Sequence, residues 1–170
     1  EYVGQTARRA ACDDPADRRE EALLSLVPRD AKQVYSMRRC MEMLFDTGTV
    51  FEIGKHWGRA AITAFARLDG WPVCVVASDP SYLGGSWEAK TSEKVERFVR
   101  LADQFRLPIV HLVDNPGFMI GREAEMAGTI RYGVNAMNAI YRATVPLASI
   151  VLRRAYGIAG SAMSNADRYQ

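Results

Sequence analysis

The stretch Leu112–Phe118, which reads Leu-Val-Asp-Asn-Pro-Gly-Phe, decides the fold class, because it ends a run of apolar residues and leads into a helical pattern. A second stretch, Leu152–Ala159 (Leu-Arg-Arg-Ala-Tyr-Gly-Ile-Ala), ends another apolar run in the same way. Loops of this kind present backbone N–H groups to a developing negative charge. The two stretches therefore indicate an enzyme built around oxyanion stabilisation rather than around a triad of ionisable side chains.

The apolar runs that end in these stretches predict an α/β fold. Residues 108–113 and 146–152 are expected to be strands buried on both faces. Helical patterns cover about 91–106 and about 123–142. Strands that alternate with helices in this order imply parallel neighbours joined by right-handed crossovers. For the second helix we expect an inward face formed by Ala127, Ile130, Val134, Met137 and Tyr141.

An antiparallel hairpin is expected before the parallel strands. Two strand-like runs, 60–68 and 71–77, are joined by Asp69-Gly70, a pair that favours the positive φ of a tight turn. Upstream of the hairpin, Asp30 is expected to cap a helix that Gly48 closes.

The composition limits the classes of function. With 170 residues, of which 48% are hydrophobic and 25% charged, the chain can bury the core of one domain and at most a piece of another. A net charge of +2 with scattered arginines argues against a nucleic-acid partner. The chain has no apolar run of about 18 residues, so no membrane span is expected. Three widely spaced cysteines predict neither a disulfide framework nor a metal site, and they favour the cytoplasm.

Small residues after the second stretch are candidates for a substrate site. Gly157, Ala159, Gly160 and Ser161 would let a substrate approach the backbone, and a helix that begins there would add its positive end. Tight packing between a helix and the sheet explains these small residues equally well. Likewise, Asn115-Pro116-Gly117 in the first stretch also suits a plain turn.

Other candidate residues have two interpretations each. Glu123 and Glu125 could form an acid–base pair, or they could stabilise the N-terminus of a helix. Tyr82, Trp87 and Phe118 could line a pocket, or they could belong to the core.

Several motifs of the sequence resemble those of biotin-dependent acyl-CoA carboxyltransferases, and they follow the family's order over about residues 13–165. The run Phe65–Val73 resembles the GFARxxGxPVG segment of that family, and Ser92–Phe98 resembles its SxKxxRF helix. Four further runs are similar to DxPGFxxGxxxE, GxIRxGA, TVP and RKAYG: Asp114–Glu125, Gly128–Gly133, Thr144–Pro146 and Arg153–Gly157.

This resemblance implies a crotonase-like (ClpP/crotonase) ββα-superhelix. Residues 1–29 would be a linker or the end of a preceding N-terminal half, and residues 30–170 a C-terminal carboxyltransferase domain that is truncated at its end. In the family, the N-terminal half mainly holds acyl-CoA, and the C-terminal half of a neighbouring subunit receives carboxybiotin. We therefore expect a fragment that needs its own N-terminal half and that forms homo-oligomers.

The resemblance also implies a mechanism. Carboxybiotin releases CO₂ and leaves a ureido enolate, whose oxygen is held by two backbone N–H groups. The biotin nitrogen then removes the α-proton of the thioester, and the new enolate attacks CO₂, so no protein base is required. By alignment, the two N–H donors fall on Ile158 and Ala159, with Gly157 and Gly160 allowing close approach.

The resemblance assigns supporting roles to other residues. Ser161 would shape the pocket, and Asp114, Gly117 and Phe118 would belong to the neighbouring loop that binds substrate or biotin. Biotin would arrive on a carrier domain of a biotin carboxyl carrier or biotin carboxylase subunit. The chain departs from the family at Ile158, where a glycine is usual and a side chain requires a negative φ. It departs again at Ser161, where propionyl- and acetyl-directed members commonly have Asp.

Three alternatives stay open. A biotin-dependent acyl-CoA decarboxylase would use the same site in the opposite direction. A non-catalytic assembly subunit would keep the fold and lose the site, and Ile158 is the feature that suggests it. A CoA hydratase or isomerase of the wider superfamily would need a glutamate pair over the thioester, for which only Glu123 and Glu125 are suitably placed. The expected compartment is the cytoplasm, or the mitochondrial matrix in a eukaryote.

Overall fold

A five-stranded sheet forms the centre of the computed structural model, which describes residues 7–15 and 17–163. The strands lie in chain order across the sheet. The first three pair antiparallel, and the last three pair parallel. The predicted α/β class with parallel strands is therefore confirmed. The bounds are β1 Phe51–Ile53, β2 Ala61–Leu68, β3 Trp71–Ser78, β4 Ile109–Asn115 and β5 Leu147–Ala155.

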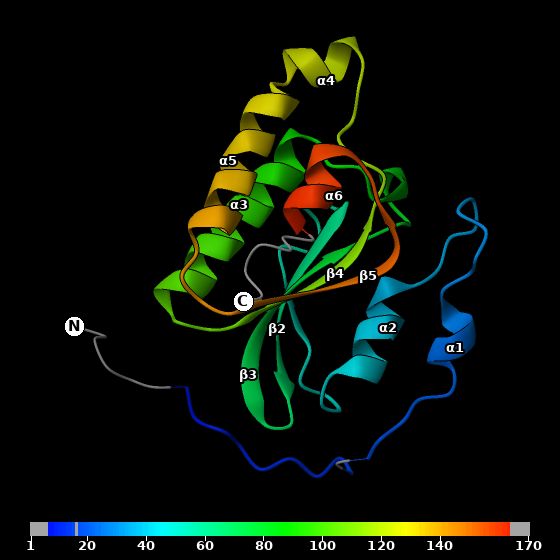
Figure 1. Cartoon of the computed structure of the whole chain (residues 1–170), viewed down its shortest axis with the longest axis vertical. Helices are drawn as coiled ribbons and strands as arrows, with labels where there is room; N and C mark the ends of the chain where they lie inside the picture. The colour runs from blue at the N-terminus through cyan, green and yellow to red at the C-terminus, as the bar shows by residue number, and fades with distance from the viewer. Residues whose placement is uncertain (1–6, 16, 164–170) are drawn as a thin grey trace.

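Helices cover both faces of this sheet and give three layers (Figure 1). On one face α3 and α5 lie side by side, together with α6, and α2 lies on the other face. Within the described part of the chain, no helix is both long and apolar enough to cross a membrane. The bounds are α1 Leu23–Leu26, α2 Met37–Leu44, the 3-10 turn η1 Leu83–Gly85, α3 Ala89–Gln104, α4 Arg122–Met126, α5 Thr129–Arg142 and α6 Gly157–Met163.

The central strands divide the core into two clusters, because successive side chains of a strand point to opposite faces. In β3, Cys74 and Val76 contact the cluster under α3 and α5, whereas Val75 belongs to the cluster under α2. In β4, Val113 contacts the cluster under α3 and α5, and Leu112 belongs to the cluster under α2. Both faces of these two strands are covered, as we predicted for β4 from its continuous apolar run.

The predicted hairpin is confirmed. β2 and β3 pair along their whole length, and the turn residues Asp69 and Gly70 have φ of 51° and 78°. The polar segment before residue 30 lies against this end of the domain. The Ala10 N–H donates to the Gly70 carbonyl oxygen at 3.0 Å, and Arg18 Nη1 donates to the Phe45 carbonyl oxygen at 3.1 Å. The assignment of residues 1–29 to a linker stays a prediction, and residues 1–6 and 16 lie outside the described part.

The helix predicted to begin at Asp30 is shorter at both ends. α2 begins at Met37, after Ser36, whose hydroxyl oxygen accepts a hydrogen bond from the Arg39 N–H at 3.2 Å. The Asp30 carboxylate instead accepts a bond from the backbone N–H two residues on, and Gly48 lies in a turn after the helix has ended. Serine and aspartate are equally good N-caps, so residue type alone could not identify the true one.

The single helix predicted over 123–142 is two helices. Gly128 has a φ of 72°, a left-handed conformation in which an α-helix does not continue, and it separates α4 from α5. The predicted inward face of α5 is wrong, because Ile130, Val134 and Tyr141 are 59%, 56% and 47% exposed. The face that packs against α3 and the sheet is formed mostly by smaller residues: Thr129, Gly133, Ala136, Ala139 and Ile140.

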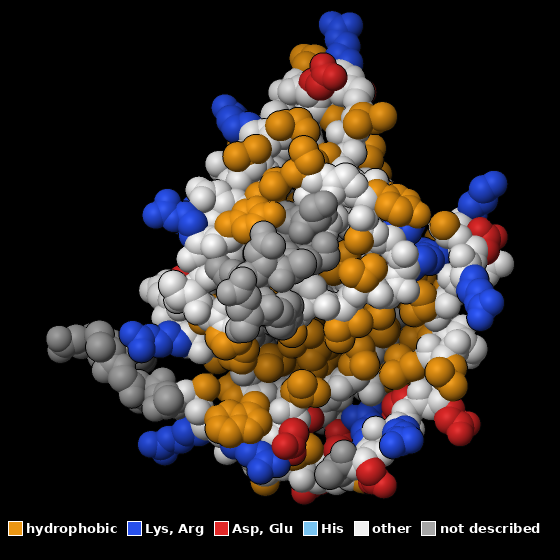
Figure 2. Space-filling view, viewed as in Figure 1, with side chains coloured by type: hydrophobic (Ala, Val, Ile, Leu, Met, Phe, Trp, Pro, Cys, Tyr) orange, Lys and Arg blue, Asp and Glu red, His pale blue; other side chains and the backbone are white. Residues whose placement is uncertain are grey.

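The prediction that residues 146–152 are buried on both faces is also wrong. β5 is an edge strand of the described sheet, and Ile150 and Val151 are about half exposed. Figure 2 shows hydrophobic side chains gathered across the middle of the face on which β5 lies in Figure 1. An apolar run indicates that a strand is buried in the functional protein. It does not indicate whether the same domain or another chain buries it.

Candidate functional site

The loops after β4 and β5 lie side by side at the carboxyl end of the parallel strands. The Tyr156 N–H donates to the Asn115 carbonyl oxygen at 2.9 Å, which ties the second loop to the end of β4. The Asn115 side-chain oxygen accepts from the Gly117 N–H at 2.6 Å and closes the Asn-Pro-Gly turn. The structure thus brings together the two stretches that the sequence singled out, at the edge where open α/β sheets bind ligands.

α6 begins directly after β5, and two backbone N–H groups of its first turn, those of Ile158 and Ala159, have no acceptor among the described residues. Gly157 has a φ of 63°, and nothing lies within 4 Å of the position that a Cβ would take. A ligand can therefore approach the backbone there. Ile158 and Ala159 donate no backbone hydrogen bond to any described residue, because the first bond of the helix runs from the Gly160 N–H to the Tyr156 carbonyl oxygen at 3.2 Å.

One face of α6 is exposed to solvent, and the other packs against the sheet. Ile158 is 62% exposed and does not have a positive φ, so its backbone does not require glycine. Ala159 is fully buried, and a Cβ on Gly160 would lie 2.4 Å from the carbonyl carbon of Ala155. Residues 159 and 160 are therefore small for helix–sheet packing as well. Ser161 lies within α6, but its side chain falls outside the described part of the structure.

Asp114 is fully buried at the end of β4 and pairs with two arginines of β5. Its Oδ2 lies 2.9 Å from Arg153 Nη2, and its Oδ1 lies 2.6 Å from Arg154 Nε. Burial alone would raise the pKa of Asp114, but the hydrogen bonds from Arg154 and Arg153 lower it below the ordinary value. Both carboxylate oxygens are engaged inside the chain, so Asp114 holds the two loops together. A direct role in ligand binding stays a prediction.

The Phe118 ring packs against Trp87 and α5. The two ring centroids lie 6.1 Å apart in an edge-on arrangement, and a Cβ on Gly133 would lie 2.4 Å from the Phe118 ring. The backbone N–H of Trp87 donates to the Gly117 carbonyl oxygen at 3.0 Å, which attaches this loop to the segment just before α3. Trp87 is fully buried and is a core residue, whereas Tyr82 lines a cavity. The predicted ligand-binding roles of Gly117 and Phe118 stay predictions.

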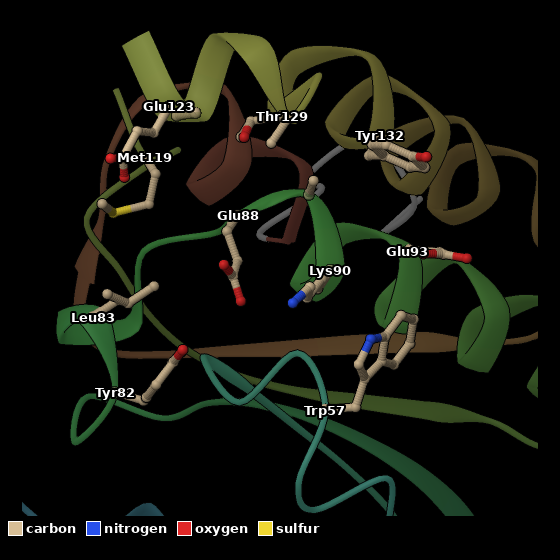
Figure 3. A pocket seen from close by; sticks show the side chains of 13 residues that line it. Trp57, Tyr82, Leu83, Glu88, Lys90, Glu93, Met119, Glu123, Thr129 and Tyr132 are labelled. Carbon is tan, nitrogen blue, oxygen red and sulfur yellow. The ribbon is translucent and has the colours of Figure 1, made fainter. Parts of the chain in front are cut away.

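A cavity of about 650 Å³ opens between η1, the start of α3, and α4 with α5 (Figure 3). Glu88 and Lys90 extend into the same space, with Trp57 on one side and Glu123 on the other. Of the described residues that we assigned to the substrate or biotin site, none lines this cavity. The sequence indicated it only through Tyr82 and Glu123, because its walls come from segments that are far apart in the chain.

Glu123 and Glu125 do not form an acid–base pair over one cavity. Glu123 lines the cavity and Glu125 does not, and both are exposed in the first turn of α4. This arrangement favours the second interpretation, in which acidic residues stabilise the positive end of a helix.

A partly buried charged cluster that the sequence did not reveal lies beside the end of β3. Arg38 bridges two carboxylates, with Nη2 2.7 Å from Glu52 Oε1 and Nη1 2.6 Å from Asp79 Oδ2. Lys94 Nζ is buried nearby and donates to two backbone carbonyl oxygens. The only signal in the sequence was the position of Lys94 in the SxKxxRF motif.

One group of side chains has the spacing of metal ligands. Ligand atoms of Cys12, Asp14 and Asp46 lie within 4.8 Å of one another. Both carboxylates, however, already accept backbone hydrogen bonds in turns: Asp14 from the Thr47 N–H at 2.8 Å, and Asp46 from the Gly70 N–H at 2.7 Å. These contacts explain the cluster without a metal, and the absence of a metal site stays a prediction.

Known proteins resemble this chain over most of its length. A family model described as a carboxyl transferase domain matches residues 2–170. The propionyl-CoA carboxylase beta chain of Roseobacter denitrificans is 40% identical over 153 residues, which are 90% of this chain and 30% of that protein. The methylmalonyl-CoA decarboxylase subunit alpha of Veillonella parvula is 37% identical over 155 residues, 91% of this chain and 30% of that protein. The chain thus spans about 30% of the length of these curated relatives.

Solved structures share the fold. A crystal structure of transcarboxylase 12S, described as a hexamer assembly with hydrolysed methylmalonyl-coenzyme A bound, superposes with a TM-score of 0.85 at 36% identity. The match covers 92% of this chain and 31% of that one. The beta subunit of geranyl-CoA carboxylase from P. aeruginosa gives a TM-score of 0.79 at 24% identity, over 94% and 29% of the two chains. The predicted crotonase-like fold is confirmed.

Proposed function

The chain belongs to the carboxyl transferase domain family, and from this premise we propose that the full-length protein is the carboxyltransferase component of a biotin-dependent acyl-CoA carboxylase. It would move a carboxyl group from carboxybiotin to the α-carbon of an acyl-CoA. The observation that carries the proposal is the start of α6, where the N–H groups of Ile158 and Ala159 lack a described acceptor beside the open backbone of Gly157.

The residues at the start of α6 fit the ureido group of biotin. Two neighbouring N–H groups can donate to an oxygen that gains negative charge, and Gly157 leaves room for a ring above the backbone. The exposed side chains of Tyr156 and Ile158 offer apolar surface beside these donors. Biotin, when bound, carries the carboxyl group to be transferred. The part of this chain is to bind and orient that group and to stabilise oxyanion charge, without a side chain acting as the base.

The partners are proposed on the same basis. Biotin would be presented by the carrier domain of a biotin carboxyl carrier or biotin carboxylase subunit, and acyl-CoA would be held mainly by the protein's own N-terminal half. We also propose that the protein self-associates, because apolar side chains of α5 and β5 are exposed and because the similar transcarboxylase 12S is described as a hexamer assembly. The compartment would be the cytoplasm, or the mitochondrial matrix in a eukaryote.

The first experiment measures the decarboxylation of malonyl-CoA and methylmalonyl-CoA by the full-length protein, with and without free biotin or its carrier. Turnover that depends on biotin supports the proposal, and the ratio of the two rates ranks the acyl pocket. A folded, oligomeric protein that turns over neither substrate would contradict carboxyl transfer from these two acyl-CoAs and would direct the search to the chemistry at Ile158.

Replacing Ala159 by proline tests the pair of N–H donors. Proline removes the N–H of residue 159, and it is tolerated in the first turn of a helix, where no intrahelical bond is lost. We expect the transfer rate to fall by about 100- to 1000-fold, as for the loss of one oxyanion-hole donor. The matched control Ala159→Gly keeps the N–H, removes only a buried methyl group and should retain most of the rate. Normal transfer by a folded Ala159→Pro protein would overturn the assignment.

A second candidate function is a biotin-dependent acyl-CoA decarboxylase, which the 37% identity to a methylmalonyl-CoA decarboxylase subunit favours. It would use the same N–H donors in the opposite direction. The neighbouring genes separate the two, since a biotin carboxylase accompanies a carboxylase and a membrane ion pump accompanies such a decarboxylase. The third candidate, a non-catalytic assembly subunit, loses support, because Ile158 has no positive φ and its side chain does not obstruct the backbone conformation.

A further inference from the structure

An irregularity in the pairing of β4 with β5 lies directly before the proposed site. Val113 pairs with Val151, but the next pair along the ladder joins Asn115 to Ala155. One residue of β4, Asp114, therefore faces three residues of β5, the segment 152–154. Such a β-bulge adds unpaired residues to one strand, bends it and changes the direction of its side chains, and bulges are common beside active sites.

The bulge explains how two consecutive arginines reach one carboxylate. In a regular strand the side chains of Arg153 and Arg154 would point to opposite faces of the sheet. Here Arg153 donates to Asp114 Oδ2 from Nε at 3.2 Å and from Nη2 at 2.9 Å, while Arg154 Nε donates to Oδ1 at 2.6 Å. We call Asp114, Arg153 and Arg154 the bulge cluster.

The remaining guanidinium N–H groups connect the bulge cluster to two other segments. Arg153 Nη1 donates to the carbonyl oxygens of Asp30 and Gln33, each at 2.8 Å, and its guanidinium lies 5.1 Å from the centre of the Tyr35 ring. Arg154 Nη2 donates to the Gly84 carbonyl oxygen at 2.7 Å. The end of β5 is therefore attached on one side to the segment before α2 and on the other side to η1.

Burial shows that these contacts hold the backbone firmly. The arginine side chains are 8% and 12% exposed, and the Asp114 side chain is inaccessible. A buried charge is costly unless it is paired, so each member depends on the others. Two residues beyond Arg154, the Tyr156 N–H bonds to the Asn115 carbonyl oxygen, and α6 begins at Gly157.

We infer that Arg153 and Arg154 are positioning residues, which fix the direction in which β5 ends and so set where the N–H groups of Ile158 and Ala159 point. The catalytic part of this inference rests on the proposed function, whereas the positioning of the backbone does not. In this proposal neither arginine contacts the transferred group. Each acts through Asp114 and through the loop that follows it.

Arg154→Met tests the inference in the full-length protein, because methionine keeps an unbranched apolar side chain but cannot pair with Asp114. Amide hydrogen exchange, measured by mass spectrometry, should accelerate in peptides that cover 153–163, since the N–H groups of Tyr156 and Gly160 lose their fixed acceptors. The rate of biotin-dependent transfer should fall about 10- to 100-fold with little change in the KM for acyl-CoA, as for a small misplacement of reacting groups. Arg154→Lys keeps the charge but cannot make both hydrogen bonds of Arg154, to Asp114 and to the Gly84 carbonyl oxygen. Its exchange rate and its transfer rate should lie between those of wild type and Arg154→Met.

Arg100→Met is the matched control, because Arg100 is an exposed arginine of α3 whose only described ion pair is with Glu96 on the same helix. It should leave exchange at 153–163 and the transfer rate unchanged. The inference is overturned if Arg154→Met folds with unchanged exchange at 153–163, or if exchange rises equally in all peptides, which would show a purely structural role. Should Arg154→Met not fold, the same two criteria apply to Arg154→Lys. If the wild-type protein shows no transfer, the proposed function fails, and hydrogen exchange still decides the positioning.

Discussion

Lys94 shows how one residue can combine a charge with a buried position. It is 5% exposed, and its Nζ donates to the carbonyl oxygens of Gly54 and Ala61 at 2.9 Å and 2.8 Å. These bonds attach the segment between β1 and β2, which carries Trp57 to the cavity, to α3. Burial lowers the pKa of Lys94 to about 8 from an ordinary 10.5, although the nearby Glu52 carboxylate opposes the shift.

The lowered pKa predicts a dependence of stability on pH. Between about pH 8 and pH 10.5 the unfolded chain still binds the Lys94 proton and the folded protein has released it. Since the unfolded state binds more protons in this window, the contribution of Lys94 to the free energy of unfolding should rise with pH. Lys94→Met removes that contribution. Urea denaturation at several pH values across the window should therefore show a steeper rise for wild type than for Lys94→Met. Parallel curves would contradict the prediction, because other titrating groups are common to both proteins.

The site was predictable from the sequence where backbone chemistry determines it. Glycine at 157 and the Asn-Pro-Gly turn indicated the two loops that the structure places side by side. The partners of Asp114 were not predictable, because period-two alternation sends only one of two consecutive strand residues to a given face. The bulge that brings Arg153 and Arg154 together has no signature in a single sequence.

At the scale of elements, α5 shows where reasoning from periodicity reaches its limit. Apolar residues at helical spacing correctly predicted a helix, and the large ones were expected inward. The structure turns a face of mostly small residues inward, because α3 lies close beside α5 and the Phe118 ring packs against Gly133. Hydrophobicity identifies helix faces that can be buried. The distance between neighbouring elements decides which of these faces packs inside the domain.

Gly133→Ala tests this packing. A Cβ at residue 133 would lie 2.4 Å from Phe118 Cζ, so the ring must move away from α5. We expect a loss of about 1–3 kcal/mol from overpacking, reduced by the better helix propensity of alanine, which is worth about 1 kcal/mol. The control Asn138→Ala changes an exposed residue of the same helix and should shift stability by less than about 0.5 kcal/mol. Thermal or urea denaturation measures both, and a stabilised Gly133→Ala protein would contradict the described contact.

For the whole molecule, the exposed apolar surface sets the expectation for assembly. Ile130, Val134 and Tyr141 form a stripe of exposed side chains along α5, and the exposed Ile150 and Val151 lie on the edge strand β5. When a partner covers side chains of this kind, the free energy of the system falls. The proposed self-association would use the α5 stripe as one contact between subunits.

Val134→Asp tests that contact in the full-length protein. A carboxylate in the middle of an apolar contact would lose its hydration without gaining a partner, so the assembly should dissociate toward a smaller species. Asn135→Asp introduces the same charge on the exposed neighbour, whose side chain is rotated by about 100° around the helix axis, and it should leave the assembly intact. Light scattering coupled to size-exclusion chromatography gives the mass of each variant, and circular dichroism confirms that both are folded. If the two variants have the mass of the wild type, the α5 stripe is not a contact between subunits. In that case the protein's own N-terminal half becomes the occupant to test, by asking whether Val134→Asp lowers the stability of the subunit instead of its mass.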